Sequence, residues 1–154
     1  MPILLVVHHT PSPNVSAMLE AVLSGARDDD LEGVEVRTRA ALAASVADVL
    51  DADGYVLGTP ANIGYMSGAL KHFFDQVYYP CMGETDRRPY GLFVHGNHDT
   101  TGARKAVESI AGALSWRRVA EPVEVTGEPS RDQLEACAEL GGTVAATLAL
   151  ESSQ

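Results

Sequence analysis

The chain has 154 residues, of which 45% are apolar, and 21 acidic against 11 basic side chains give it a net charge of −10. This length predicts one domain, and the acidic excess disfavours a nucleic-acid partner, which needs a basic face. No apolar run approaches the ~20 residues of a membrane span, the N-terminus lacks the basic start of a signal peptide, and the two cysteines form no CxxC pair. We therefore expect a reduced, cytoplasmic protein with no membrane span.

Ile3 to Val7 form a continuous apolar strand, the pattern of a strand that is buried on both faces of a parallel sheet. Apolar residues at helical spacing then predict a helix from Val15 to Ala26, which Arg27 to Asp30 and Gly33 end. The other elements expected in this half are a strand at 34–37, a helix from a capping box of Ser45 and Asp48 to Leu50, and a strand at 55–57.

The second half continues this alternation. A long apolar stripe predicts a helix from Met66 to about Tyr78. The remaining expected elements are an irregular segment at 80–89, a strand at 90–94, a loop at 95–101, a helix at 103–114, a strand at 122–125, and a last helix that Ser130 and Asp132 begin. Five strands alternating with five helices indicate an α/β fold with a parallel sheet, helices on both faces and right-handed crossovers. We expect one domain over 1–150 and a frayed tail over 151–154.

In such a fold, ligands bind outside the carboxyl ends of the strands. Three of these ends are rich in hydroxyl or amide groups and carry no Lys or Arg: HHTPSPNVS from His8, GTPANIGYM from Gly58 and HGNHDTTG from His95. In the first, Thr10, Ser12, Asn14 and Ser16 precede or open a helix, whose free N–H groups and dipole favour an anion. Ser12 or Asn14 as a simple helix cap is the alternative, but the three loops together favour a phosphate site.

The second loop suits a flat ligand. Pro60 fixes one turn and Gly64 permits a close approach of the backbone. The N–H groups of Asn62, Ile63 and Gly64 are expected to face the polar edge of an aromatic ring, with Tyr65 beside it, although a plain loop with a glycine turn stays open. The chain contains no GxxxxGK[ST], no GxGxxG after the first strand and no GxSxG, which disfavours an ATP-type loop, a dinucleotide site and an α/β-hydrolase.

The stretch GTPANIGYMSGALKHFFDQ resembles the third-strand loop and following helix of flavodoxin-like FMN proteins, nearest to the NADPH-dependent FMN reductase and NAD(P)H:quinone oxidoreductase branch. The match covers eighteen consecutive residues, Gly58 to Asp75. The resemblance implies a flavodoxin-like three-layer sandwich, a five-stranded sheet in the order 2-1-3-4-5, and noncovalently bound FMN. The first loop departs from the family pattern, because two prolines each remove a potential amide donor.

The resemblance also implies which residues hold FMN. The phosphate is expected on Thr10, Ser12, Asn14, Val15 and Ser16, with His9 near it, and the ring against the segments from Pro60 to Tyr65 and from His95 to His98. The full expected set is His9, Thr10, Ser12, Asn14, Val15, Ser16, Thr59, Pro60, Ala61, Asn62, Ile63, Gly64, Tyr65, His95, Gly96, Asn97 and His98. For each histidine, a structural role in its loop is an equal alternative.

A metal site at His8, His9, His95, His98 and Asp99 is disfavoured. The third strand is expected to separate the two histidine pairs, and adjacent residues of a strand point to opposite faces. We therefore expect no metal.

The resemblance implies an oxidoreductase that takes electrons from NAD(P)H and passes them through FMN to a quinone or similar acceptor. No residue stands out as a proton donor, so none is assigned as catalytic. A noncatalytic flavodoxin is the first alternative, because an acidic surface suits a basic redox partner protein. A flavodoxin-fold binding module that has lost FMN is the second, on the evidence of the two prolines.

Two further groups have an expected role outside the three loops. Tyr78, Tyr79 and Met82 are candidates for a homodimer interface. Arg87 and Arg88 are more readily explained as solvated loop charges than as a site for a nicotinamide cofactor phosphate.

Overall fold

The computed structural model describes residues 1–28 and 33–153. Asp29, Asp30 and Gln154, which the sequence analysis placed in a break and in the tail, lie outside the described residues. The strands are β1 (Ile3–His8), β2 (Glu35–Ala40), β3 (Gly54–Asn62), β4 (Tyr65–Met66), β5 (Pro89–Gly96), β6 (Arg117–Arg118) and β7 (Val123–Thr126). The helices are α1 (Pro13–Ala26), α2 (Val46–Asp51), α3 (Gly68–Cys81), α4 (Thr101–Ala113) and α5 (Arg131–Ser152).

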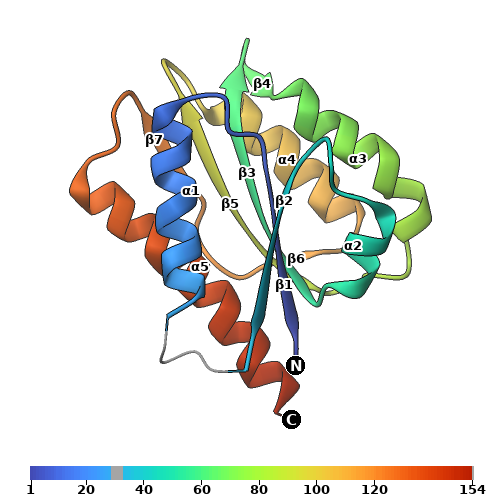
Figure 1. The fold of residues 1–154 in the computed structure, drawn as a ribbon. Coiled ribbons are helices and arrows are strands. Elements are labelled where there is room, and N and C mark those ends of the chain that lie inside the picture. The colour runs from blue at the N-terminus through green and yellow to red at the C-terminus, as the bar shows by residue number, and fades with distance from the viewer. Residues whose placement is uncertain (29–32, 154) are drawn as a thin grey trace.

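The sheet runs in the order β2-β1-β3-β5-β6 (Figure 1). β6 pairs with the start of β5, and β7 pairs with the end of β5 on the same side. All of these pairs are parallel, whereas β4 adds an antiparallel pair to the end of β3. The expected order 2-1-3-4-5 is therefore confirmed, with the fifth strand divided into β6 and β7. The N–H of Val119 still donates to the carbonyl of Tyr90, and residues 120–122, which include Pro122, interrupt the pairing with β5.

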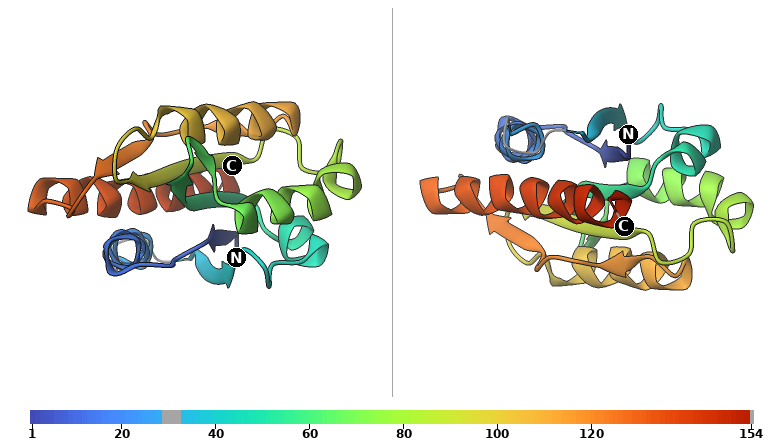
Figure 2. Two further views of the ribbon diagram at one scale, coloured as in Figure 1. Left: turned by 90° about the horizontal axis from the view of Figure 1, so that it is seen from above. Right: turned by 90° about the horizontal axis from the view of Figure 1, so that it is seen from below.

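Two apolar clusters cover the two faces of the sheet. Figure 2, in views along the strands, shows the helices that lie on both sides of the sheet. Leu4 and Val6 of β1 belong to the cluster under α1 and α5, and Leu5 and Val7 belong to the cluster under α2, α3 and α4. All four side chains are fully buried. The alternation of a strand thus turns one apolar run into both cores, which confirms the three-layer sandwich.

The helix boundaries differ from the predicted ones where a cap or a strand intervenes. Met66 belongs to β4, because the hydroxyl of Ser67 accepts a hydrogen bond from the Leu70 N–H and starts α3 at Gly68. At its other end α3 includes Pro80, which was expected in an irregular segment. The capping box of α5 pairs Ser130 with Gln133 rather than with Asp132.

Strands β1, β2, β3 and β5 and the last helix are longer than predicted. β3 continues to Asn62 and β5 to Gly96, so several residues expected in loops lie in strands. Helix α5 includes Glu151 and Ser152, two residues of the tail. That the tail frays stays a prediction.

Candidate functional site

Three segments meet at the carboxyl ends of β1, β3 and β5, the upper edge in Figure 1. The first segment is tied to β3, because the N–H of His9 donates to the carbonyl of Gly58 over 3.1 Å. The second and third touch, since a Cβ built on Gly96 would lie 3.3 Å from the Cβ of Ala61. The fold therefore brings together the three loops in which the sequence predicted a site.

The first segment ends in an ordinary helix cap. Ser12 is the N-cap of α1, and its hydroxyl accepts from the N–H of Val15 at 3.3 Å. The N–H of Ser16 donates to the carbonyl of Ser12. Two amides that the sequence analysis assigned to phosphate are thus already engaged, and Ser12 plays the capping role that was left open.

Other donors of this segment make no capping contact, although the Thr10 hydroxyl lies 2.8 Å from Nδ1 of His8. Pro13 occupies the first helical position, where its missing N–H has little consequence. The N–H of Asn14 has no acceptor among the described residues, and the side chains of Thr10, Asn14 and Ser16 are half-buried at the helix start. No acidic residue lies in the first turn of α1, so the positive end of the helix dipole is available to an anion.

The second segment is a β-hairpin rather than a plain loop. Ala61 pairs with Met66 and Asn62 with Tyr65, leaving Ile63 and Gly64 at the tip with φ of 51° and 73°. Positive φ at both central residues is the signature of a type I′ hairpin turn. Asn62 and Gly64 are exposed beside the fully exposed Ile63 and partly exposed Tyr65, so the tip offers its backbone to a ligand.

The base of the hairpin is closed. Thr59 is buried, and its hydroxyl donates to the carbonyl of Pro60 at 2.8 Å and accepts from the Ser67 N–H at 2.9 Å. Pro60 is also buried, and Ala61 is half-buried. The hydroxyl of Thr59 is engaged within the protein, so the side chain braces the hairpin, and the expected contact of Thr59 with FMN stays a prediction.

The third segment contributes a short, exposed turn. Asn97 and His98 are exposed, and the carboxylate of Asp99 accepts from the Thr101 N–H at 2.9 Å. That backbone hydrogen bond lowers the pKa of Asp99. Asn97 and His98 are thus left open to a ligand, whereas the carboxylate of Asp99 is engaged with the N–H of the first residue of α4.

His95 has a partner that its position in the sequence did not reveal. It is 6% exposed, and its Nε2 lies 2.7 Å from the carbonyl oxygen of Gly127, at the end of β7. A carbonyl only accepts, so Nε2 carries a proton and donates it. His95 therefore joins the loop after β7 to the site, an alternative to the expected contact with a cofactor ring.

The donor set fits a phosphate-bearing flat cofactor. Hydroxyl, amide and free N–H groups converge at a helix N-terminus, and a hairpin tip with exposed backbone stands beside them. The three segments contain no Lys or Arg, so the phosphate would be held by neutral donors and the helix dipole.

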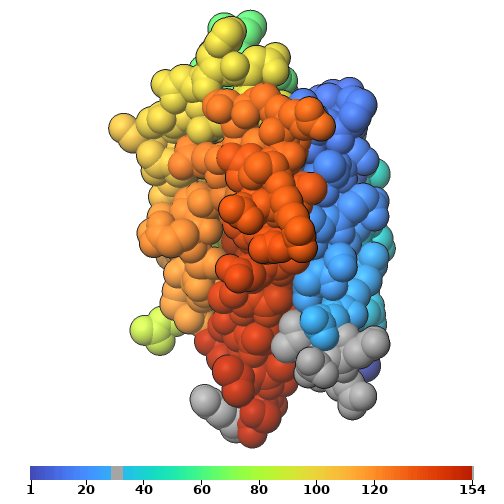
Figure 3. Space-filling view, turned by 90° about the vertical axis from the view of Figure 1, so that its left-hand side faces the viewer, coloured from blue at the N-terminus to red at the C-terminus, as the bar shows by residue number. Residues whose placement is uncertain are grey.

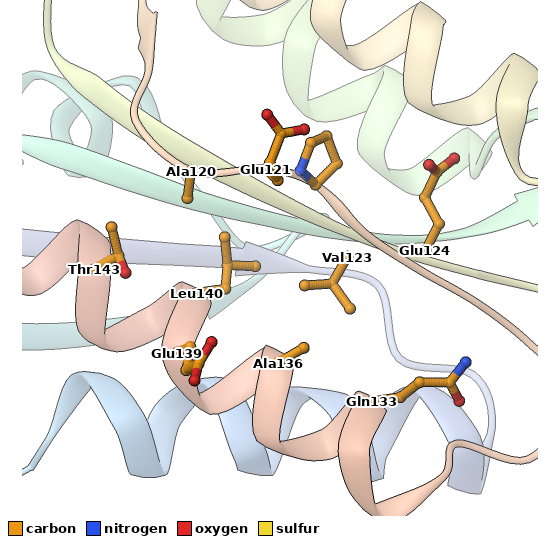
Figure 4. Close-up of a pocket in the computed structure, with 10 residues that line it drawn as sticks. Ala120, Glu121, Val123, Glu124, Gln133, Ala136, Glu139, Leu140 and Thr143 are labelled. Atoms are coloured by element: carbon orange, nitrogen blue, oxygen red, sulfur yellow. The ribbon is translucent and has the colours of Figure 1, made fainter.

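A groove elsewhere on the molecule does not compete for this role. It has a volume of about 490 Å³ and lies between α5 and the segment from Ala120 to Glu124 (Figures 3 and 4). Glu121, Glu124 and Glu139 line it, and Figure 4 shows Val123 pointing toward Ala136 and Leu140. Glu124 and Glu121 are paired with Arg104 and Arg118, but the lining residues include no Lys or Arg, so this groove is unsuited to a phosphate group.

Arg88 lies away from the three loops. Its Nη1 contacts the carbonyl oxygens of Val49, Leu50 and Ala52 and the hydroxyl of Tyr55 at 2.7–3.2 Å. Arg88 therefore caps the C-terminal end of α2 and holds it against β3. Arg88 is therefore neither the solvated loop charge nor the binding site for a nicotinamide cofactor phosphate that the sequence analysis considered.

The described residues contain neither a candidate metal site nor a membrane-spanning helix. No group of three or more His, Cys, Asp or Glu side chains there is placed to hold a metal ion. Within the same residues, no helix has the length and apolarity to span a membrane.

Comparison with known proteins points to one family. A family model described as NADPH-dependent FMN reductase matches residues 14–125. The chain is 32% identical over 174 residues to a protein of Aquifex aeolicus (strain VF5) named flavodoxin, an alignment that covers 95% of this chain and 86% of that protein.

Solved structures show the same fold. An archaeal flavodoxin superposes with a TM-score of 0.80 at 18% identity, covering 95% of this chain and 98% of the other. A WrbA-like flavodoxin protein from Agrobacterium tumefaciens gives 0.79 at 21% identity, with 98% and 99% covered. Rubredoxin oxygen:oxidoreductase from Desulfovibrio gigas gives 0.84 at 15% identity, but this chain spans 37% of that larger protein.

Proposed function

This chain belongs to the NADPH-dependent FMN reductase family, and from that premise we propose that it takes electrons from NAD(P)H and passes them through FMN to a quinone or similar small acceptor. The observation that carries the proposal is the meeting of three neutral, donor-rich segments at one edge of a parallel sheet. Bound FMN supplies two-electron chemistry, and the protein contributes its binding, orientation and electrostatic surroundings.

The start of α1 is the proposed phosphate end of the site. The Ser16 hydroxyl, the side-chain amide of Asn14 and the Asn14 N–H are the donors that the capping contacts leave available, and the Thr10 hydroxyl, 2.8 Å from Nδ1 of His8, is a fourth group at this end. The α1 dipole adds a favourable field for an anion. Ser12 and Val15 shape this end through their mutual hydrogen bond.

The hairpin tip and the turn after β5 are the proposed ring end of the site. Backbone N–H groups at Ile63 and Gly64 would face the polar edge of the ring, with Tyr65 beside it. Asn97 and His98 would line the opposite side. His95, through Gly127, would hold the neighbouring loop in place.

A noncatalytic electron carrier is the second candidate, and two observations favour it. The relative from Aquifex aeolicus is named flavodoxin, and the net charge of −10 suits a basic redox partner. Both readings require FMN, but only the first requires reaction with NAD(P)H by the isolated protein.

Steady-state oxidation of NADH and of NADPH by the FMN-loaded protein, with a soluble quinone as acceptor, separates the two. The reductase proposal predicts turnover that depends on both the nicotinamide and the quinone. Protein that holds FMN, is reduced by dithionite, and yet leaves NADH and NADPH unoxidised would establish the carrier instead. Free FMN at the same concentration is the control.

We also infer a cytoplasmic location and a homodimer. Cys81 and Cys137 are both free and buried, which suits a reducing compartment.

The homodimer is inferred from side chains at the end of α3. Tyr79 is 80% exposed and Met82 is 45% exposed there, and Tyr79 meets Tyr78 edge to face. Exposed aromatic and methionine side chains of this kind are enriched in protein interfaces. Sedimentation of the wild type and of Tyr79→Glu tests the dimer, which the variant should weaken.

A further inference from the structure

His8, the last residue of β1, contacts the segment before α1 in which we propose that the FMN phosphate binds. His8 lies on the same face of β1 as Leu4 and Val6, which pack under α1 and α5. Its Nδ1 is 2.8 Å from the hydroxyl oxygen of Thr10. Thr10 is the first side-chain donor of the segment that leads into α1.

The direction of this hydrogen bond decides what Thr10 can offer a phosphate. A threonine hydroxyl has one hydrogen to donate, and phosphate oxygens accept. If the neutral His8 ring accepts at Nδ1, the Thr10 hydrogen points at the ring and is lost to the ligand. If Nδ1 carries a hydrogen, it donates to the Thr10 oxygen, and the hydroxyl hydrogen is free.

The surroundings of His8 contain little other charge. Its neighbours in register, Ala40 and Gly58, carry none, and the first turn of α1 has no acidic residue. The adjacent His9 is the titratable group that acts on it. Burial, with a smaller contribution from His9, lowers the pKa of His8, so its ring is mainly neutral at pH 7 in the free protein.

We propose that His8 is a positioning residue for the FMN phosphate: when protonated, it donates from Nδ1 to Thr10, frees the Thr10 hydroxyl for a phosphate oxygen, and places a positive charge beside a segment that has no Lys or Arg. This inference rests on the proposed binding of the FMN phosphate at the start of α1. Within that site, His8 takes the place of a basic side chain.

The sign of the pH dependence follows from linkage. A phosphate dianion favours the protonated ring, so FMN binding raises the pKa of His8 above its value in the free protein. The affinity for FMN therefore rises as the pH falls through the pKa of the complex, and the gain is complete below the pKa of the free protein. Riboflavin lacks the phosphate and should show no such gain.

Fluorescence titrations with FMN and riboflavin between pH 5.5 and 8.5 test the proposal. His8→Asn places a neutral amide donor near the position of Nδ1, and His72→Asn, on the exposed side of α3, is the matched control. Protonation of the FMN phosphate itself changes the affinity of all three proteins by the same factor, so it cancels in the ratio of two affinities at one pH. We expect wild type and His72→Asn to gain about tenfold in FMN affinity over His8→Asn at the acid end, as for one pKa unit of coupling.

A second measurement remains decisive if His8→Asn folds poorly. NMR titration of the His8 ring in the wild type should show its pKa rising with FMN and not with riboflavin, and the rise should shrink in Thr10→Val. If the protein binds FMN but the pKa of His8 does not move, or if its FMN affinity depends on pH as that of His8→Asn does, the proposed role of His8 is wrong. The proposed function would still stand in that case. Failure to bind FMN at every pH would overturn the proposed function as well.

Discussion

The carbonyl oxygen of Gly64 lies 1.9 Å from the position that a Cβ at Gly102 would occupy. The tip of the β3–β4 hairpin therefore rests directly on the first turn of α4. Only glycine at position 102 permits this approach. The contact fixes the position of the hairpin tip relative to α4 at the edge of the sheet.

The first prediction concerns that contact. Gly102→Ala should push the hairpin away from α4, reducing the free energy of unfolding by about 1–3 kcal/mol and weakening FMN binding. Gly112→Ala in the same helix is the control, because no atom lies within 4 Å of its Cβ. That control should gain about 0.5–1 kcal/mol. Urea denaturation of both variants measures the difference, and equal stabilisation by both would contradict the contact.

The second prediction concerns the strain at the hairpin tip. Ile63 is β-branched and fully exposed, yet it has a φ of 51°. Ile63→Asn should raise the free energy of unfolding by about 1 kcal/mol, since Asn tolerates this conformation and no buried contact is lost. A loss of stability in urea denaturation would show that Ile63 makes a compensating contact.

A pair of isosteric substitutions should have opposite effects. The hydroxyl oxygen of Thr38 is buried without a hydrogen-bond partner among the described residues, whereas that of Thr59 has two partners. Thr38→Val should stabilise the protein by about 1 kcal/mol, and Thr59→Val should destabilise it by about 1–3 kcal/mol. Thermal melts of the two variants provide the test, and changes of the same sign would be evidence against these assignments.

The fourth prediction concerns Arg88. Arg88→Met removes a guanidinium from the three carbonyls of α2 and its C-cap and from the Tyr55 hydroxyl, and should cost about 2 kcal/mol. Trp116, which stacks on Tyr55 at a centroid distance of 4.1 Å, reports the unfolding by its fluorescence. Arg87→Met is the control, because Arg87 is exposed. An equally small change in both variants would rule out the capping role.

Local patterns in the sequence predicted five alternating strands and helices, but not β4 or the division of the fifth strand into β6 and β7. The continuous apolar run from Ile3 to Val7 predicted a doubly buried strand, and its side chains do divide between both cores. The apolar stripe that begins at Met66 predicted α3. Met66 itself lies in β4, because a buried apolar residue just before a helix can match the helical spacing without belonging to the helix. The cap at Ser67, which sets the boundary, depends on the contact of its N–H with Thr59, eight residues earlier.

The details of the candidate site depend on contacts between distant residues. His95 bonds to Gly127 across 32 positions, and Gly102 of α4 meets Gly64 at the tip of the β3–β4 hairpin. No spacing rule connects such pairs. The contact between His8 and Thr10 is local, but a hydrogen bond from a strand end to the following loop has no signature in the residue pattern. Sequence therefore located the three loops, and the structure showed which of their groups remain free.

Titration of the purified protein with FMN, followed by its visible absorption spectrum, tests the central claim most directly. We predict the two absorption bands of a bound flavin, shifted from those of free FMN, at one FMN per chain. A protein that stays colourless after FMN is added and the excess is removed would contradict the account, and would leave a flavodoxin fold that serves as a binding module.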